Sequence, residues 1–280
     1  MNPLSIMPQQ INRRAVVTVS PIGGGAGIEF DGFRITFDVQ KSNEKKVQNK
    51  AKISIYNLSD ESFNWFTKKD MAISLMVGWG ESADNLLFYG EIVRALKEKK
   101  DADWIINVES GDAAKAYKKA SISKSYPEQT PHNTVFADAT NELFKGNIIK
   151  GVKGVFATPN TFKKGFTAHG SATKVIDDIL TINNFDWQIH NGILEIQKKG
   201  LSTNVVKLSS ASGLIGSPEV TSTGIKGTCL LQPEIAPMQK LYLDSIYLKG
   251  LFTPTKVTHT GDTHEGRWET TFETDERTVL

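Results

Sequence analysis

The stretches LSSASGLIGSPEVTSTGIKGTCLLQPEIAPMQKLYLDS (Leu208–Ser245) and GLFTPTKVTHTGDTHEGRWETTFETDE (Gly250–Glu276) break into short strand-like runs separated by Gly and Pro. Glycine and proline end strands and open turns, and several short strands at close spacing are typical of an all-β unit. This end of the chain therefore predicts a small closed β-barrel or β-sandwich, which we call the last β block (residues 201–280).

A second strand-rich region, the first β block (residues 1–112), has the same character. Apolar and polar residues alternate over Ala15–Ser20, Phe33–Gln40 and Ala51–Leu58, which is the pattern of half-buried strands. Ser59, followed by two acidic residues, is a helix N-cap signal and predicts one short helix. Further strands are predicted over Met71–Trp79, Asn85–Lys99 and Asp103–Ser110, so that about six or seven strands would form a closed antiparallel barrel.

Between the two β blocks, the middle module (residues 113–200) shows helical spacing. GDAAKAYKKA (Gly111–Ala120) favours helix, and Asn133–Phe144 and Ala172–Ile182 place apolar residues three or four positions apart. Ser171 can cap the last of these helices, and Asn191–Gly192 predicts the turn of a hairpin. The sequence thus predicts a mainly β chain with an α+β middle: two antiparallel β-barrel domains, residues 1–112 and 201–280, flank a small α/β insert domain at 113–200.

Composition narrows the functional classes. The 33 basic and 31 acidic residues leave a net charge of +2, and no Lys/Arg cluster is interleaved with aromatic residues, so specific nucleic-acid binding is disfavoured. Cys229 is the only cysteine, which excludes an internal disulfide, a multi-thiolate metal site and a CxxC redox motif. Neither a signal-peptide pattern nor a run of ~18 apolar residues is present. We therefore expect a soluble protein, made in the cytoplasm, without membrane insertion.

The sharpest candidate for metal or catalytic chemistry is HTGDTHEG, which brings His259, Asp262, His264 and Glu265 within seven residues. Imidazole and carboxylate groups are common metal ligands. However, Thr-Gly-Asp-Thr between two alternating segments is also ordinary turn chemistry, and a closed zinc site needs ligands that converge on one point. We favour a hairpin tip, and we assign no catalytic, cofactor-binding or metal-binding residue and no cofactor.

The other candidates also have structural interpretations. Gly23–Gly27 lacks the Gly-Lys-Ser/Thr ending of a phosphate loop and is interpreted as a flexible connection. Asp177 and Asp178 are adjacent on a helix and point about 100° apart, so they are unsuited to paired acid–base work, and Asp177 is expected to face solvent. Cys229 is expected to fill a core position. His132, His169 and His190 are predicted to be surface or turn histidines, and Trp65, Trp79, Trp104, Trp187 and Trp268 are predicted to be separate core anchors.

A family resemblance rests on the order and spacing of several segments. FRITFDVQKSNEKKVQNKAKISIYNLSDES (Phe33–Ser62) followed by LLFYGEI (Leu86–Ile92) resembles the opening barrel of bacteriophage tail baseplate hub proteins. GFTAHGSATKVIDDILTINNFDWQIHNGILEIQ (Gly165–Gln197) is similar to the α/β module that these proteins insert between barrels. The likeness to their second barrel is carried by Gly213–Gly216, the Leu231–Glu234 turn and the hairpin from His259 to Trp268.

The resemblance implies a structural hub protein, related to the hubs of T-even phages and phage Mu and to the spike base of type VI secretion. In that family, two barrels per subunit in a trimer imitate a sixfold ring. The implied partners are two further copies of the chain, the tail tube protein, the spike or puncturing protein, the tape-measure protein and other baseplate proteins. DNA would only pass through the channel. The implied location is the virion tail baseplate, after assembly in the host bacterial cytoplasm, and no enzymatic activity is implied.

Three alternatives stay open at this point. A distal-tail ring protein of a non-contractile phage also places barrels at the end of a tube, although the paired barrels favour the hub. A metal-dependent hydrolase would use His259, Asp262 and His264. A carbohydrate-binding β-sandwich would need an exposed row of aromatic residues. The last two belong to different functional classes from a hub.

Overall fold

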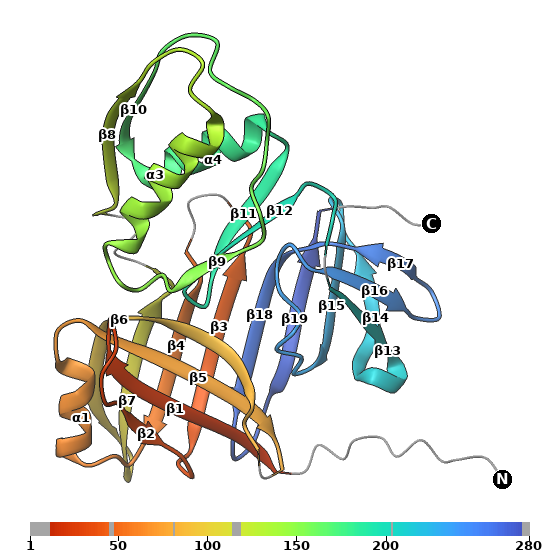
Figure 1. The fold of residues 1–280 in the computed structure, drawn as a ribbon. Coiled ribbons are helices and arrows are strands. Elements are labelled where there is room, and N and C mark those ends of the chain that lie inside the picture. Colours follow the sequence, from red (N-terminus) through yellow and green to blue (C-terminus); the bar gives the residue numbers. More distant parts are fainter. Residues whose placement is uncertain (1–11, 45–47, 81, 114–118, 203, 276–280) are drawn as a thin grey trace.

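The computed structural model describes residues 12–44, 48–80, 82–113, 119–202 and 204–275. Within these ranges the chain is mainly β (Figure 1). The helix predicted over Gly111–Ala120 falls largely on residues 114–118, which lie outside the described ranges, as does most of the N-terminal segment. No helix in the described ranges has the length and apolar composition that crossing a membrane requires.

The strands of the first β block end within two residues of their predicted bounds. The predicted and observed bounds agree because apolar and polar side chains alternate along each strand, so that one face is buried and the other faces solvent. The observed strands are β1 (Arg13–Pro21), β2 (Ile28–Phe30), β3 (Ile35–Ser42), β4 (Lys50–Tyr56), β5 (Met71–Trp79), β6 (Asn85–Lys100) and β7 (Asp103–Gly111). The helix predicted after Ser59 is α1 (Asp60–Thr67), and the Ser59 hydroxyl accepts a hydrogen bond from the Ser62 backbone N–H at 3.1 Å, which confirms the N-cap.

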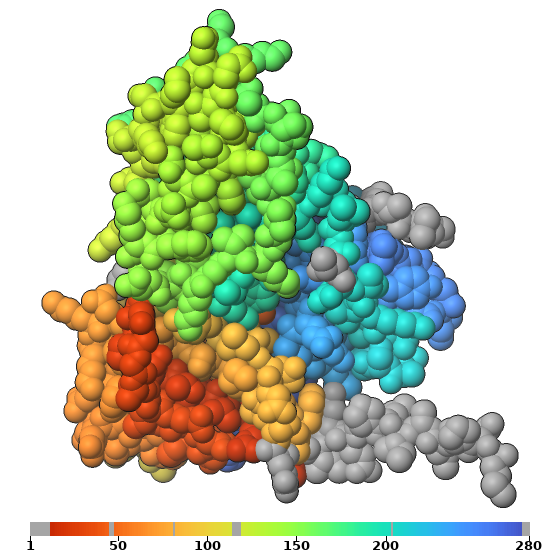
Figure 2. Space-filling view, viewed as in Figure 1, coloured from red at the N-terminus to blue at the C-terminus, as the bar shows by residue number. Residues whose placement is uncertain are grey.

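The middle module forms a separate lobe above the two β blocks (Figures 1 and 2). It contains helices α3 (His132–Phe144) and α4 (Ala172–Ile182) and strands β8 (Ser121–Tyr126), β9 (Gly151–Lys153), β10 (Phe166–Ser171), β11 (Phe185–His190) and β12 (Ile193–Lys198). β8 pairs with β10, and β11 and β12 form the predicted hairpin, with β9 parallel to β12. The Ser171 hydroxyl makes no side-chain cap, because it bonds to the Thr173 hydroxyl at 2.7 Å instead.

The last β block contains a small sheet and two hairpins. The small sheet consists of β13 (Val205–Ser209), β16 (Lys240–Asp244) and β17 (Lys249–Phe252), and β13 is parallel to β16. The hairpins are β14 (Leu214–Val220) with β15 (Ile225–Leu230), and β18 (Pro254–Asp262) with β19 (Trp268–Thr274). The predicted turn at Gly261–Gly266 therefore does connect two alternating strands.

Strands from both ends of the chain share one sheet. Its eleven strands run in the order β14-β15-β19-β18-β3-β4-β7-β6-β5-β1-β2, and β18 pairs antiparallel with β3 from Lys256 opposite Ser42 to Asp262 opposite Thr36. The two predicted closed barrels do not form in the described residues. The edge of β3 that a closed first barrel would use is occupied by β18, so the sheet continues from one β block into the other.

Eight of these strands form a repeated arrangement, which we call the wall: β14-β15-β19-β18-β3-β4-β7-β6. In the first β block, hairpins β3–β4 and β6–β7 join through β4 and β7. In the last β block, hairpins β14–β15 and β18–β19 join through β15 and β19 in the same way. Each block thus contributes four antiparallel strands of the same connectivity, and β18–β3 is the seam between them.

The seam has a shared apolar core. Trp268 on β19 packs edge-to-face against Phe37 on β3, with ring centroids 5.2 Å apart, and against Trp79 on β5 at 5.7 Å. Trp268 and Leu231 belong to the same buried cluster as the strands of the first β block. Gly261 lies directly between Phe37 and Trp268 in the strand register. The absence of a side chain at residue 261 makes room for both rings.

We predict that Gly261→Ala destabilises the fold. A Cβ there would meet the Phe37 ring and come within 2.7 Å of Trp268 Cε3, and overpacking of a filled core costs about 1–3 kcal/mol. Urea denaturation of the purified protein would measure the loss. Gly151→Ala on β9 is the control, since its nearest neighbour is Ile193 Cδ1 at 3.8 Å. Equal unfolding free energies for the two variants would show that the seam is not closely packed.

Candidate functional site

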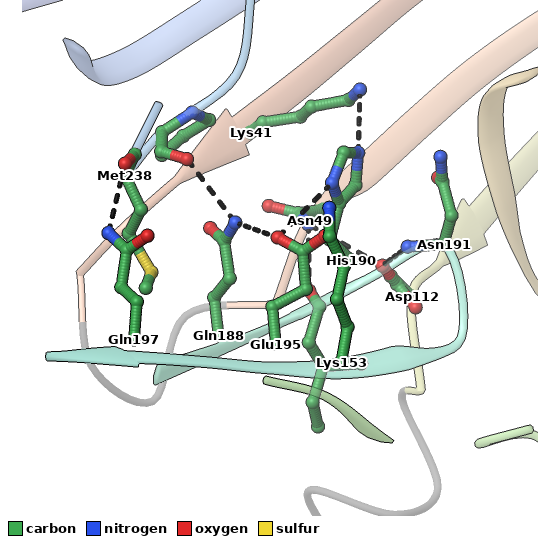
Figure 3. A network of polar contacts seen from close by, with 12 residues as sticks. Lys41, Asn49, Asp112, Lys153, Gln188, His190, Asn191, Glu195, Gln197 and Met238 are labelled. Atoms are coloured by element: carbon green, nitrogen blue, oxygen red, sulfur yellow. Dashed lines mark hydrogen bonds and ion pairs between the residues drawn. The ribbon is translucent and has the colours of Figure 1, made fainter. Parts of the chain in front are cut away.

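A network of polar side chains, several of them buried, lies where the middle module meets both β blocks (Figure 3). The first β block supplies residues from β3, from the β3–β4 connection and from the end of β7, and the middle module supplies the β11–β12 hairpin and Lys153 of β9. Several of these side chains are almost fully buried, with 2% exposure for Lys41 and 1% for Asp112. We call this network the polar joint; it comprises Lys41, Asn49, Asp112, Lys153, Gln188, His190, Asn191, Glu195 and Gln197.

The centre of the polar joint is a contact between Lys41 and His190. Lys41 Nζ lies 3.0 Å from His190 Nε2, and His190 Nδ1 lies 3.9 Å from Glu195 Oε2. An ammonium group only donates, so His190 Nε2 accepts and the ring proton sits on Nδ1, facing Glu195. Burial lowers the pKa of Lys41 to about 8, while Asp112 and Glu195 oppose this shift. Burial, Lys41 and Lys153 hold the pKa of His190 well below its usual value, so the imidazole is neutral.

Asp112 attaches the hairpin turn of the middle module to the first β block. Its carboxylate accepts hydrogen bonds from the backbone N–H groups of Asn191 at 2.6 Å and Gly192 at 3.1 Å. Asn49 adds a bond from its amide to the Ile189 carbonyl at 3.0 Å. Burial raises the pKa of Asp112 to about 6 in spite of the bonds that favour its charged form. The turn is therefore held by groups that would be costly to leave unpaired.

The opposite side of the polar joint reaches the last β block. Gln188 Nε2 donates to the Pro237 carbonyl at 3.2 Å and to Glu195 Oε2 at 2.8 Å, and Gln197 Nε2 donates to the Met238 carbonyl at 2.9 Å. Lys153 pairs with Glu195 Oε1 at 3.1 Å. One hairpin thus carries hydrogen bonds to both β blocks, and these bonds define the position of the middle module on the wall.

The structure does not assemble the metal-site candidate. His259 is fully buried on β18, where its Nδ1 lies 2.9 Å from the Thr270 hydroxyl, while His264 is exposed at the hairpin tip. Burial, followed by Lys41 and His190, holds the pKa of His259 well below its usual value. Among the described residues, no three His, Cys, Asp or Glu side chains are grouped to hold a metal ion.

The remaining members of that candidate fasten the hairpin tip to the first β block. Arg34 pairs with Asp262 Oδ2 at 2.8 Å and with Glu265 Oε1 at 3.2 Å. Arg13 Nη1 donates to the Gly266 carbonyl at 2.9 Å. Burial would raise the pKa of Asp262, but the Arg34 hydrogen bond and the His264 backbone N–H outweigh it and lower that pKa. These residues act as a structural clasp at one end of the seam.

Some of the single-residue predictions are confirmed and others are wrong. Cys229 is buried, as predicted for a residue that fills a core position, and burial raises the pKa of its thiol to about 12. His169 is exposed and His190 directly precedes the hairpin turn, as predicted for surface or turn histidines, but the prediction is wrong for His132, which is buried and lies 2.9 Å from Asn183 Nδ2. Asp177 does not simply face solvent, because its carboxylate accepts from Trp187 Nε1 at 3.1 Å.

The predicted tryptophan anchors and the glycine loop have mixed outcomes. Trp187 and Trp268 are buried, and Trp65 and Trp79 pack against the first core, but Trp104 is 46% exposed and lies beneath the Lys97 and Lys99 ammonium groups. The glycines at 23–27 connect β1 to β2, and three of them have φ values in the left-handed region. The five tryptophans therefore do not form an exposed row on which a sugar or a nucleic-acid base could stack.

The wall has one apolar face and one polar face. Buried residues such as Ile53 and Phe272 alternate with half-exposed residues of the opposite face. The polar face contains hydroxyl, amide and charged groups of both signs, with Lys226 paired to Glu273 at 3.4 Å and Ser54 bonded to Asn107 at 2.7 Å. Its members include Thr36, Asp38, Gln40, Lys52, Ser54, Asn107, Glu109, Lys226, Thr228, Thr258, Thr260, Glu269, Thr271 and Glu273.

Solved structures similar to this chain include phage tail proteins and a type VI secretion component. The 43 kDa tail protein of prophage MuSo2 from Shewanella oneidensis aligns over 93% of this chain and 98% of its own, with a TM-score of 0.64 and 10% identity. A tail protein from Neisseria meningitidis MC58 aligns over 95% and 97%, with a TM-score of 0.64 and 10% identity. At this identity the likeness establishes the fold, which is that of phage tail proteins.

A type VI secretion component of E. coli, the c3393 protein, has the same fold. It aligns over 86% of this chain and 72% of its own, with a TM-score of 0.61 and 11% identity, and is described as similar to the T4 tail proteins gp27 and gp5. No curated protein shows significant sequence similarity to this chain. The model of the family called baseplate hub gp41 matches residues 17–248. The chain belongs to this family of phage baseplate hub proteins, as the resemblance in the sequence implied.

Sequence reasoning missed the polar joint, although one signal was present. On β3 the buried positions are Ile35, Phe37, Val39 and then Lys41, so a lysine occupies a place in the alternation where an apolar residue is expected. A polar residue at a core position indicates a buried polar partner. The partners, His190 and Asp112, lie far away in the sequence, and no local pattern connects them to β3.

We predict that the protein loses stability below pH 6.5. In the unfolded chain, His190 and His259 titrate near pH 6.5, but in the folded chain their pKa values lie well below this. The unfolded state therefore binds more protons as the pH falls, and each histidine contributes a slope of up to about 1.4 kcal/mol per pH unit. Asp112, whose pKa is raised to about 6, opposes this below pH 6.

The contribution of His259 is isolated by comparing pH slopes. Urea unfolding at pH 7.5, 6.5 and 5.5 should show a shallower loss for His259→Gln than for the wild type, since glutamine does not titrate. His264→Gln is the matched control, because His264 is exposed at the hairpin tip, and it should follow the wild-type slope. If His259→Gln also follows that slope, burial of the His259 imidazole does not contribute to the acid sensitivity of the fold.

Proposed function

We propose that this baseplate hub protein is a structural component that closes into a trimeric ring of pseudo-sixfold symmetry. The ring joins the tail tube to the central spike and encloses the channel for DNA and the tape-measure protein. The repeated wall is the observation that carries the proposal. Because each chain contributes two four-stranded units of the same connectivity, three chains supply six similar units around one axis.

The proposed domain organisation follows the same logic. Residues 1–112 and 201–280 act as the two tube-like β domains, and residues 113–200 form the α/β domain between them. Three buried apolar clusters support this division, centred on the first β block, the middle module and the last β block. The clasp at Arg34 and the polar joint then set the angle between the two tube-like domains, as a ring of defined size requires.

The polar face of the wall suits the lining of a channel. Hydroxyl groups and paired charges of both signs would present no continuous positive surface, so a passing polyanion would not be held by the chain. This agrees with DNA as a molecule in transit rather than a ligand. Function then depends on surfaces rather than on a catalytic group, and we propose no enzymatic activity and no cofactor.

The partners follow from the position of such a ring. We propose that the tail tube protein stacks on one rim and the spike protein on the other, with further baseplate proteins at the periphery. The E. coli relative is described as a type VI secretion component similar to the T4 tail proteins gp27 and gp5, and a chain of a Francisella PdpA–VgrG complex has a similar fold. The proposed location is the virion tail baseplate, following assembly in the host cytoplasm.

We predict that the protein forms trimers, alone or when tube or spike protein is added. Native mass spectrometry should detect a mass of three chains, and electron-microscopy class averages should show threefold rings with a pseudo-sixfold inner wall. A protein that stays monomeric at every concentration, with both partners present, would contradict the ring. A ring with an inner wall of plain threefold form would contradict the equivalence of the two β units.

A further inference from the structure

The two halves of the wall each contain a tryptophan at the same position. Trp268 begins β19 and lies opposite Gly261, the last residue but one of β18. Trp104 lies near the start of β7, opposite Lys99, which is the last residue but one of β6. Since β7 corresponds to β19 in the repeat of the wall, and β6 corresponds to β18, the two tryptophans are equivalent. In each strand, buried residues follow the tryptophan at alternate positions, so both rings lie on the apolar face of the wall.

The surroundings of the two tryptophans differ. Trp268 is 3% exposed, because the first β block covers it with the rings of Phe37 and Trp79. Trp104 is 46% exposed and lies at the end of the wall, where no further β block of the same chain follows. The chain therefore buries one of two equivalent rings and leaves the other partly uncovered.

The turn that covers Trp268 also has an equivalent in the last β block. Trp79 ends β5, which pairs antiparallel with the first half of β6 directly ahead of the wall hairpin β6–β7. In the last β block, β16 pairs antiparallel with β17 directly ahead of the wall hairpin β18–β19. The turn after β16 (residues 245–248) thus corresponds to the turn after Trp79. We call it the apolar turn, since it contains Ile246 and Tyr247.

The apolar turn presents its side chains to solvent from a well-ordered backbone. Ile246 and Tyr247 are 91% and 82% exposed, more than any other large apolar side chain of the described residues. The Ser245 backbone N–H donates to the Leu248 carbonyl at 3.0 Å, and the Leu248 N–H donates to the Ser245 hydroxyl at 3.0 Å. A turn that is already ordered loses little conformational entropy on binding.

We propose that the apolar turn of one copy packs Ile246 and Tyr247 onto Trp104 of a second copy. This contact repeats, between chains, the packing of Trp79 on Trp268 inside the chain. It rests on the proposed ring, and it identifies an aromatic anchor between the subunits of that ring. Partly uncovered tryptophan and tyrosine side chains are the residue types that most often dominate the binding energy of an interface.

A second copy is the occupant that the observations favour. The β16–β17 hairpin and β7 lie on opposite sides of the molecule, so the apolar turn faces away from the Trp104 of its own chain (Figure 1). Two identical Trp104 surfaces would bring two Lys99 ammonium groups together, since Lys99 lies 5.9 Å from the centre of the Trp104 ring. A contact between two different surfaces of one chain runs head to tail, as closure into a ring requires.

A double-mutant cycle tests the contact. Trp104→Ala and Tyr247→Ala should each weaken trimer formation by about tenfold or more. The double variant should be no weaker than the more affected single variant, because each substitution removes the same contact. Native mass spectrometry over a concentration series measures trimer formation, with tube or spike protein added if the wild type needs it. Effects that multiply in the double variant, or trimer formation that is unaltered in Tyr247→Ala, would overturn the contact.

Two controls separate this effect from a loss of folding. Tyr247→Ala should leave the midpoint of thermal unfolding of the monomer unchanged, since the side chain is 82% exposed. Val155→Ala, at a 79% exposed position of the middle module, should change neither trimer formation nor that midpoint. If Val155→Ala weakens trimer formation as much as Tyr247→Ala does, the apolar turn has no special role and the proposal fails.

Thiol cross-linking tests which surfaces meet. Ile246→Cys and Lys99→Cys place thiols beside Tyr247 and Trp104 and keep both aromatic rings, and the native Cys229 is buried. After assembly together and treatment with a short bis-maleimide, an equimolar mixture of the two variants should give covalent dimers, while each variant alone should give none. Val155→Cys in place of Lys99→Cys is the matched control and should give no dimer with Ile246→Cys.

The outcomes distinguish this contact from the ring itself. Trimers by native mass without cross-linked products in the mixture, or with products from Ile246→Cys alone, would overturn the contact and leave the ring in place. A chain that stays monomeric under every condition would overturn both.

Discussion

The pairing of β18 with β3 is the interaction on which the rest of the structure depends. It joins the two ends of the chain through a continuous antiparallel ladder, and the Arg34–Asp262 ion pair at its end connects residues 228 positions apart. A strand ladder satisfies the backbone groups of both edges, and the entropy lost in closing such a long loop grows only slowly with its length. Because β3 is used in this way, neither β block closes on itself, and the chain presents one wall with two open ends.

The polar joint has a different role from the seam. Apolar packing of Trp268 and Phe37 stabilises the seam, whereas burying Lys41 and Asp112 is costly, as the pKa of about 8 for one and about 6 for the other indicates. Hydrogen bonds have directions that apolar contacts lack. The bonds from Asp112 to the Asn191–Gly192 turn therefore specify one orientation of the middle module, which suits a subunit whose shape must repeat around an axis.

Local patterns predicted the helices and strands well, but they did not predict which elements lie beside one another. The apolar stripe of α4, the Ser59 cap and the Asn191–Gly192 turn each depend on residues a few positions apart, and all three are present. Closed barrels were the wrong prediction because alternation shows that a strand is half buried but not which strand lies beside it. The contacts of His190 were missed for the same reason: it stands beside a turn, as predicted, but the sequence did not show that the turn binds Asp112 or that the ring contacts Lys41.

By itself, the sequence determined the strands, the helices and the family, since periodicity, capping and turn chemistry act over short distances and the order of the segments is distinctive. Only the tertiary structure decided that β18 lies beside β3, that both blocks build the same four-stranded arrangement, and that Lys41, His190 and Asp112 meet. Strand pairing and buried polar contacts join residues that are distant in the chain. The packing of the whole molecule decides which strands and which buried polar residues become partners, and a local stretch of sequence does not contain that information.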